Sequence, residues 1–134
     1  MHMYSTLQSR PSLHGQHALL VHANSADTPY YKNMLTDMGY HITHAPNLIG
    51  AFNAIDQQYF NMVLFDVTLP DGSGIELLKA LRFDRKFINS TLVAMTHIKD
   101  ANLRRQYLEK GIDAYFEKPL CSQKLARRLQ LLSN

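Results

Sequence analysis

The chain has 134 residues, of which 46% are hydrophobic and 19% are charged. This is the length of one domain with its own core, and the composition is ordinary for a globular protein. A single cysteine, Cys121, excludes an internal disulfide and a cysteine-based zinc site. No apolar run approaches membrane-spanning length and the first residues lack a signal-peptide core, so we expect a cytoplasmic domain without a membrane partner.

The net charge of +3 is modest, and the 14 lysines and arginines are scattered along the chain. The only basic doublets are Arg104-Arg105 and Arg127-Arg128. Such doublets are typical of solvated helix faces. We therefore expect no nucleic-acid partner for this domain.

Residues 1–16 are polar and without periodicity, which predicts a linker or a disordered start before a domain over residues 17–134. The apolar residues 18–21 predict the first strand. Ser25 or Asp27 is expected to cap the following helix, which ends near Met38 because Gly39 stops it.

The second strand is predicted over residues 41–44, where polar and apolar residues alternate as in an edge strand. Asn47 is expected to cap a helix that ends near Gln57. The third strand, residues 62–65, is an apolar run that ends in Asp66. A run of this kind is typical of a strand buried on both faces, as in a parallel sheet.

A turn with the sequence Pro-Asp-Gly follows the third strand, and a helix is predicted from Ile75 to near Asp84. Residues 91–96 predict the fourth strand and residues 100–110 the next helix, which Gly111 stops. A short fifth strand over 114–116 leads to the last helix. That helix covers residues 122–132, with Leu125, Leu129 and Leu132 expected on its inner face.

Five strands thus alternate with five helices. Right-handed crossovers between parallel strands then predict a doubly wound α/β domain of three layers. In such sheets the carboxyl ends of the strands lie at one edge, where ligands bind. The residues delivered to that edge are His22, Ala23, Asp66, Thr96 and Lys118.

A carboxylate, a hydroxyl and an ammonium at one edge suit an anion held beside a nucleophile. Asp66 has the chemistry to attack phosphorus, while Lys118 and Thr96 have the chemistry to bind phosphoryl oxygens. Each residue alone has an ordinary explanation: a loop cap, a surface charge and a strand-forming residue. Their combination favours a phosphoryl-group site.

With these residues the chain resembles a response-regulator receiver domain of two-component signalling, a CheY-like domain, over about residues 17–133. The matching features are the strand ending in Asp66, the Leu69-Pro70-Asp71-Gly72 turn, Thr96 and the segment 115–119. The intervals also match, since Thr96 lies 30 residues after Asp66 and Lys118 lies 22 residues after Thr96.

The resemblance implies a flavodoxin-like sheet in the order 2-1-3-4-5 and a signalling module rather than an enzyme. It implies that Asp66 is the phospho-acceptor, with a histidine kinase or histidine phosphotransfer protein as the donor in a phosphorelay. Lys118, before a cis Pro119, then pairs with the phosphoryl group and Thr96 moves toward it. Tyr115 is implied to be a switch residue on the surface of the fourth helix, fifth strand and fifth helix.

The first strand departs from the family pattern. Receivers usually place two acidic residues after it, which hold Mg²⁺ together with the acceptor aspartate and a backbone carbonyl. Here those positions carry His22 and Ala23, so only Asp66 and the Thr68 carbonyl remain as ligands. Mg²⁺ requires hard oxygen ligands, so we expect weak binding at best. A further imidazole, His97, is expected to crowd the pocket.

The sequence therefore predicts a degenerate receiver that keeps its acceptor but has lost its metal site. Without Mg²⁺ it is expected to be phosphorylated weakly or not at all and to act through protein contacts. Its expected contact face, the surface of the fourth helix, fifth strand and fifth helix, also suits a homodimer. Candidate contact residues there are Arg104, Arg105, Tyr107, Tyr115, Glu117, Lys124 and Arg128. Residues 1–16 are compatible with origin from a hybrid histidine kinase.

Several alternatives stay open. The first is a conventional receiver phosphorylated at Asp66, and the second is a transition-metal site formed by His22, His97 and Asp66. A phosphatase of the haloacid-dehalogenase type also uses a strand-end aspartate, but Thr68 stands where its second aspartate is needed. A flavin requires a different phosphate loop after the first strand, and a cobalamin module requires a histidine shortly after Asp66, so neither cofactor is expected.

Overall fold

The computed structural model describes residues 15–133, so the expected linker at 1–16 lies almost wholly outside the described residues. The strands are β1 (His17–Val21), β2 (His41–Ala45), β3 (Met62–Asp66), β4 (Thr68–Leu69), β5 (Gly72–Ser73), β6 (Thr91–Thr96) and β7 (Ala114–Glu117). The helices are α2 (Thr28–Asp37), α3 (Leu48–Gln57), α4 (Gly74–Phe83), the 3₁₀ helix η1 (Arg85–Phe87), α5 (Ala101–Glu109) and α6 (Ser122–Ser133).

The main sheet is parallel and has the strand order β2-β1-β3-β6-β7. Because β6 and β7 are its fourth and fifth strands in chain order, the expected order 2-1-3-4-5 is confirmed. The central strands β3 and β6 are buried on both faces, as their apolar runs predict. The edge position of β2 agrees with its alternating sequence.

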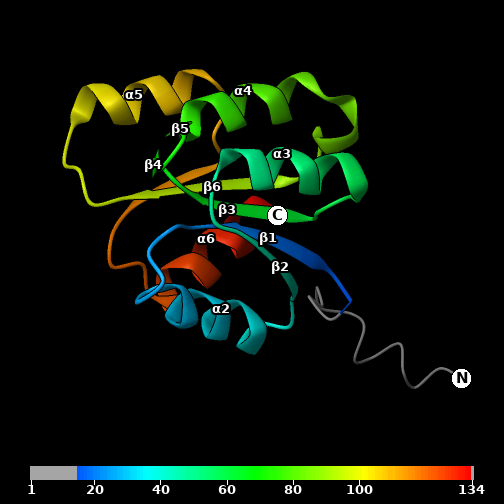
Figure 1. Ribbon diagram of the computed structural model, residues 1–134. Coiled ribbons are helices and arrows are strands. Elements are labelled where there is room, and N and C mark those ends of the chain that lie inside the picture. The colour runs from blue at the N-terminus through cyan, green and yellow to red at the C-terminus, as the bar shows by residue number, and fades with distance from the viewer. Residues whose placement is uncertain (1–14, 134) are drawn as a thin grey trace, which may run out of the picture.

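Helices cover both faces of this sheet, with α3, α4 and α5 on one face and α2 and α6 on the other (Figure 1). Side chains alternate between the faces along each strand. Val63 and Phe65 therefore belong to the core beneath α3 and α4, whereas Met62 and Leu64 belong to the core beneath α2 and α6. The predicted three-layer architecture is confirmed.

The turn after β3 holds the neighbouring helix α3. It forms the small hairpin of β4 and β5, which was not predicted. The Asp71 carboxylate accepts hydrogen bonds from the backbone N–H of Leu48 at 2.7 Å and of Ile49 at 3.1 Å. These bonds lower the pKa of Asp71, and the bond from Leu48 has the larger effect. Asn47 caps the same helix as predicted, accepting from the Gly50 N–H at 2.8 Å.

Two predictions about helices α2 and α6 need correction. Asp27 occupies the N-cap position of α2, but its side chain makes no capping hydrogen bond there. In α6, Leu125 is buried and Leu129 packs against the core, whereas Leu132 is 41% exposed. None of the helices within residues 15–133 is long and apolar enough to cross a membrane.

Candidate functional site

The sheet register places the predicted site residues at one edge. Val21 of β1 pairs with Phe65 of β3, so His22 and Asp66, the next residue of each strand, lie level with one another. On the other side, the backbone N–H of Lys118 donates to the Thr96 carbonyl at 2.8 Å. Parallel strands thus bring four of the predicted residues together.

Gly74 lets the start of α4 pack directly against the Asp66 backbone. Its N–H donates to the Val67 carbonyl at 2.8 Å. A Cβ atom at this position would lie 2.7 Å from the Asp66 carbonyl oxygen, 2.9 Å from Phe65 Cδ2 and 2.9 Å from the Tyr107 hydroxyl. Only a glycine fits such a close approach without displacing the backbone.

The buried ammonium of Lys118 contacts both Asp66 and His22. Lys118 Nζ donates to Asp66 Oδ2 at 2.5 Å and lies 3.1 Å from His22 Nε2. The side chains of Lys118, Asp66 and His22 are 3%, 13% and 0% exposed. The centroid of the Tyr31 ring lies 6.0 Å from the ammonium. The other Asp66 oxygen, Oδ1, receives only a long contact of 3.4 Å from the Thr68 N–H.

His22 is held from its other side by residues that the sequence did not single out. Its Nδ1 lies 2.8 Å from Thr28 Oγ1, and the Thr28 hydroxyl donates to the Asn24 carbonyl at 2.9 Å. Thr28 lies six residues after His22, across the loop between β1 and α2, so no periodicity within one element pointed to it. Burial, and next the charge of Lys118, lower the pKa of His22.

This lowered pKa predicts a specific dependence of stability on pH. Since His22 binds a proton less readily in the folded state, its contribution to stability is fully present above its unfolded pKa of 6.5. That contribution is lost as the pH falls below 6.5 and through the folded-state pKa. The groups acting on His22 are Lys118, Asp66, Asp27 and His44.

Urea unfolding of wild type and His22→Leu from pH 7.5 to pH 5 measures this contribution, because the other histidines are common to both proteins. Wild type should lose stability faster on acidification, by at most about 1.4 kcal/mol per pH unit for one proton. Parallel pH profiles for the two proteins would contradict the prediction.

The remaining predicted residues lie around this centre. Thr96 is 1% exposed, and its hydroxyl oxygen accepts from the Ile98 N–H at 3.0 Å. Ala23, Thr68 and His97 are exposed. The peptide bond between Lys118 and Pro119 is cis, as the resemblance implied.

Tyr115 and Tyr107 do not lie on the surface, so their expected place in an exposed contact face was wrong. They are 8% and 0% exposed, and their ring centroids are 5.5 Å apart. Neither buried hydroxyl makes a hydrogen bond of good geometry, although that of Tyr107 lies near Ser73 and Ile75. Burial raises the pKa of Tyr107 to about 12. Arg104 covers Tyr115 instead, with its guanidinium 5.6 Å from the ring centroid.

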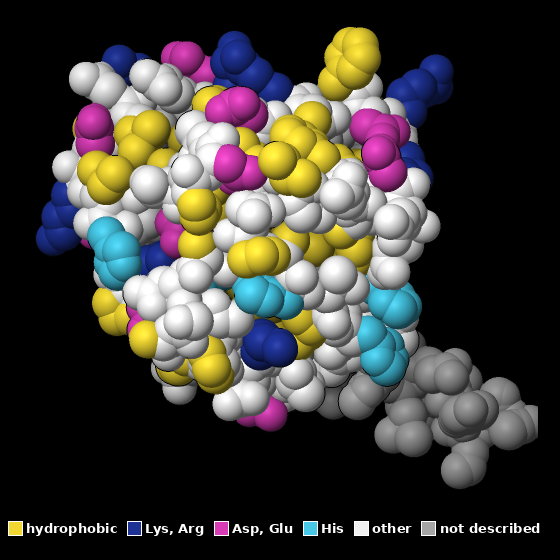
Figure 2. All heavy atoms as spheres, viewed as in Figure 1, with side chains coloured by type: hydrophobic (Ala, Val, Ile, Leu, Met, Phe, Trp, Pro, Cys, Tyr) yellow, Lys and Arg dark blue, Asp and Glu magenta, His cyan; other side chains and the backbone are white. Residues whose placement is uncertain are grey.

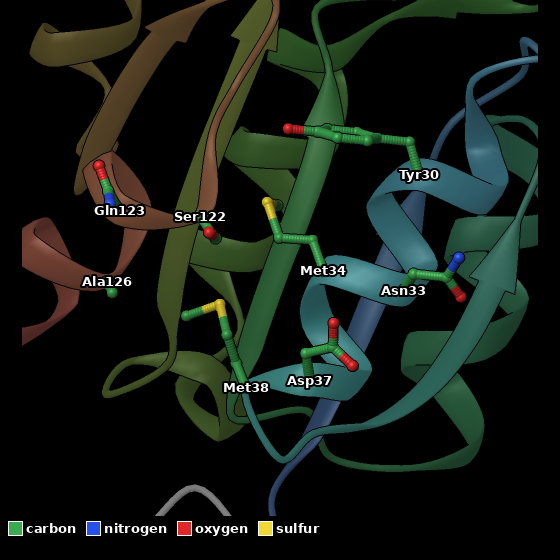
Figure 3. Close-up of a pocket in the computed structure, with 8 residues that line it drawn as sticks. All are labelled: Tyr30, Asn33, Met34, Asp37, Met38, Ser122, Gln123 and Ala126. Atoms are coloured by element: carbon green, nitrogen blue, oxygen red, sulfur yellow. The ribbon is translucent and has the colours of Figure 1, made fainter.

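Two pockets lie on the α2 side of the molecule, and Tyr30 lines both of them. The smaller, about 360 Å³, borders the site and is lined by Asp27, Tyr30, Tyr31, His97, Lys118 and Pro119. The larger, about 490 Å³, lies between α2 and α6, where Tyr30, Met34 and Met38 face Ser122, Gln123 and Ala126 (Figure 3). Because its lining includes neither Asp66 nor Lys118, the larger pocket is separate from the site chemistry.

The alternative of a transition-metal site receives no support. Across residues 15–133, no three or more histidine, cysteine, aspartate or glutamate side chains are grouped so that they could hold a metal ion. His22 and Asp66 approach one another at 3.7 Å, but Lys118 contacts both of them. A buried ammonium at this point repels a metal cation.

With this geometry in view, comparison with known proteins identifies the family. The response regulator receiver domain family matches residues 19–130. The chain therefore belongs to the response regulator receiver domain family, whose members are modules of two-component signalling.

The sequence relatives are much longer proteins. The chain is 32% identical over 112 residues to the sensor protein GacS of Pseudomonas syringae pv. syringae, covering 81% of this chain and 12% of that protein. It is also 32% identical over 125 residues to the sensor histidine kinase GacS of Pseudomonas protegens, covering 91% of this chain and 13% of that protein.

Solved receiver structures agree with the fold. One is the receiver domain of the sensor histidine kinase PA1611 from Pseudomonas aeruginosa PAO1, described with a magnesium ion in its active site cleft. It shares 27% identity at a TM-score of 0.77 and covers 87% of this chain and 96% of that one. A CheY-like receiver domain from Methylobacillus flagellatus shares 30% identity at a TM-score of 0.77, covering 87% and 98%.

Proposed function

We propose that this chain is an atypical receiver that acts through protein–protein contacts, with little or no Mg²⁺-dependent phosphorylation of Asp66. One observation carries the proposal: Lys118 bridges Asp66 and His22, with Nζ 2.5 Å from Asp66 Oδ2 and 3.1 Å from His22 Nε2. The carboxylate that would serve as metal ligand and phospho-acceptor is thus already neutralised by a cation of the chain itself.

The residues present do not fit Mg²⁺. This ion requires about six oxygen ligands in octahedral geometry and usually takes them from carboxylates and water. At the first-strand positions, His22 offers only nitrogen, and one of its nitrogens faces Thr28. Ala23 offers no ligand. We therefore propose that the protein offers Mg²⁺ only two ligands, the Asp66 carboxylate and the Thr68 carbonyl.

The two alternatives differ in what they require of the same pocket. A conventional receiver would phosphorylate Asp66 through its Oδ1, the oxygen that Lys118 does not engage. A small aspartate-nucleophile phosphatase would also need an acid or base two residues after Asp66. Thr68 is exposed at that position and has no group that titrates near neutral pH. We therefore retain the conventional receiver as the main alternative.

Labelling with acetyl phosphate distinguishes these functions. Wild type should be labelled slowly or not at all at saturating Mg²⁺, because the ion lacks its acidic ligands and the developing phosphoryl charge then loses the metal that would neutralise it. Asp66→Asn gives the background, and a receiver with the usual acidic pair gives the positive control. Rapid Mg²⁺-dependent labelling that disappears in Asp66→Asn would establish the conventional receiver instead.

The partner that we propose is a histidine kinase, a histidine phosphotransfer protein or a second copy of this chain. Similarity to GacS supports origin from a hybrid kinase, since the chain spans only 12% and 13% of those relatives. The proposed contact face is now the exposed part of α5, β7 and α6. It consists of Arg104, Arg105, Glu117, Lys124 and Arg128. Acidic and basic side chains are interspersed over the upper part of the view in Figure 2, where α4 and α5 lie.

Charge reversal tests this contact face. The double variant Arg104→Glu/Arg128→Glu should weaken self-association or kinase binding by more than ~1 kcal/mol, the scale that marks an interface contributor. Lys32→Glu/Lys79→Glu makes the same charge change at exposed positions on α2 and α4 and should have no effect. Sedimentation equilibrium measures the dimer, and surface plasmon resonance measures kinase binding. Association that is unchanged by the α5–α6 variant, or that requires phosphorylated Asp66, would refute the proposal.

A further inference from the structure

We infer that His22 is a positioning residue: it is a hydrogen-bond acceptor of fixed orientation that holds the Lys118 ammonium against Asp66. The inference deepens the proposed function and rests on it for the role of the pocket. It gives His22 a task of its own, whereas the resemblance to receivers marks this position only by the lack of a carboxylate. It also predicts which proton His22 carries.

The contact with Lys118 defines the protonation state of one ring nitrogen of His22. A lysine ammonium has three N–H donors and no acceptor. His22 Nε2, at 3.1 Å from Lys118 Nζ, must therefore present a lone pair. If Nε2 carried a proton, two donors would face each other at a site where both side chains are at most 3% exposed. Buried donors without an acceptor are strongly destabilising.

The contact with Thr28 independently defines the protonation state of the other ring nitrogen. The Thr28 hydroxyl has one proton, and it donates that proton to the Asn24 carbonyl at 2.9 Å. Its oxygen then accepts from His22 Nδ1 at 2.8 Å. Nδ1 must therefore carry the proton. Both ends of the ring thus require the same neutral form, with Nδ1 protonated and Nε2 free.

This chain of bonds has a direction. The α2 start fixes Thr28, Thr28 fixes the ring of His22, and His22 fixes the ammonium of Lys118 opposite Asp66. The ammonium then has an anion and an imidazole lone pair as acceptors and the Tyr31 ring beside it. A histidine that merely filled space would show no preference between its two nitrogens.

The first experiment needs no variant. Long-range ¹H–¹⁵N correlation spectra of wild type at pH 7.5 distinguish the two neutral tautomers and the protonated ring, because each gives its own pair of nitrogen shifts. We expect His22 in the Nδ1–H form. An Nε2–H tautomer, or a protonated ring, cannot accept from Lys118 and would overturn the inference.

The second experiment follows the ammonium of Lys118, whose N–H signal is visible only when hydrogen bonds protect it from exchange with water. His22→Leu removes one of the two acceptors and leaves the ammonium bonded only to Asp66, so the signal should weaken strongly. His22→Gln places an amide oxygen within reach of the Nε2 position and should restore it. His97→Leu is the matched control, since His97 is exposed and lines the same pocket as Lys118.

A third variant addresses the orientation by Thr28. Thr28→Val keeps the shape of the side chain but removes the acceptor of the Nδ1 proton, so the imidazole should lose its fixed orientation and the Lys118 signal should weaken. A sharp signal in Thr28→Val, or in His22→Leu, overturns the inference. Failure of the proposed function would be seen separately, as Mg²⁺-dependent labelling in a protein that still shows the Nδ1–H tautomer.

Discussion

Replacing Gly74 by alanine should destabilise the domain by about 1–3 kcal/mol, the range for overpacking a filled site. Helix propensity alone gives the opposite sign, since alanine is more favourable than glycine by about 1 kcal/mol within a helix. The steric term decides, because the new Cβ would lie 2.7 Å from the Asp66 carbonyl oxygen. Backbone cannot yield as the end of a flexible side chain can. Urea denaturation with an unchanged m-value measures the loss.

Gly50→Ala is the matched control, because Gly50 also lies in the first turn of a helix. Its added Cβ would meet only side chains, Asn47 Oδ1 at 3.1 Å and Ala45 Cβ at 3.3 Å. The loss should therefore be clearly smaller than at Gly74. Equal effects at the two positions would show that the contact with Asp66 is not responsible.

Tyr107→Phe separates the contacts around Gly74. Alone it should be neutral or slightly stabilising, because it removes a buried hydroxyl that makes no hydrogen bond of good geometry. Combined with Gly74→Ala it should recover part of the loss, since one of the three close contacts disappears. The recovery appears as a coupling energy in the double-mutant cycle. Strict additivity would place the strain at the backbone of Asp66 and the ring of Phe65.

The strand framework was predictable because each central strand is an apolar run that ends in a polar residue. Parallel pairing then necessarily brings Asp66, Thr96 and Lys118 to one edge, whatever the details of packing. The predicted cap at Asn47 was equally local, since it depends on the N–H of Gly50 three residues later. Signals carried by short stretches of sequence were sufficient for these features.

The predictions failed where the position of a side chain depends on packing between segments that are distant in sequence. Tyr107 lies in a polar helix and was expected at the surface, but it is the one buried residue of α5 because its ring packs against Phe65 and Tyr115. The bridge from Arg82 to Asp113, at 2.7 Å, likewise joins residues 31 positions apart. The partners of His22 could not be read from spacing. At position 22 the resemblance to receivers pointed to a missing carboxylate, but nothing in the sequence indicated the bond to Lys118.

Restoring the acidic pair with His22→Asp/Ala23→Asp should create a Mg²⁺ site at least tenfold stronger than that of wild type, or about 1.4 kcal/mol. Position 22 already faces the pocket, with His22 Nε2 3.7 Å from Asp66 Oδ2. Position 23 is exposed at the same edge. Two new carboxylates beside Asp66 supply the hard oxygen ligands that the ion requires. The removal of the His22 acceptor also frees Lys118 from one of its two hydrogen bonds.

Amide shifts near Asp66 and Thr68 during Mg²⁺ titration measure the affinity. Two single variants then show how much of the gain in affinity comes from each position. Ala23→Asp keeps the bond between His22 and Lys118, so it should gain less than the double variant. His22→Asp both adds an oxygen ligand and releases the ammonium, so it should gain more than Ala23→Asp. The double variant with Asp66→Asn should return to weak binding, because the central ligand is then neutral. If wild type already saturates at the same Mg²⁺ concentration as the double variant, the bridging ammonium does not exclude the metal, and the pocket is that of a conventional receiver.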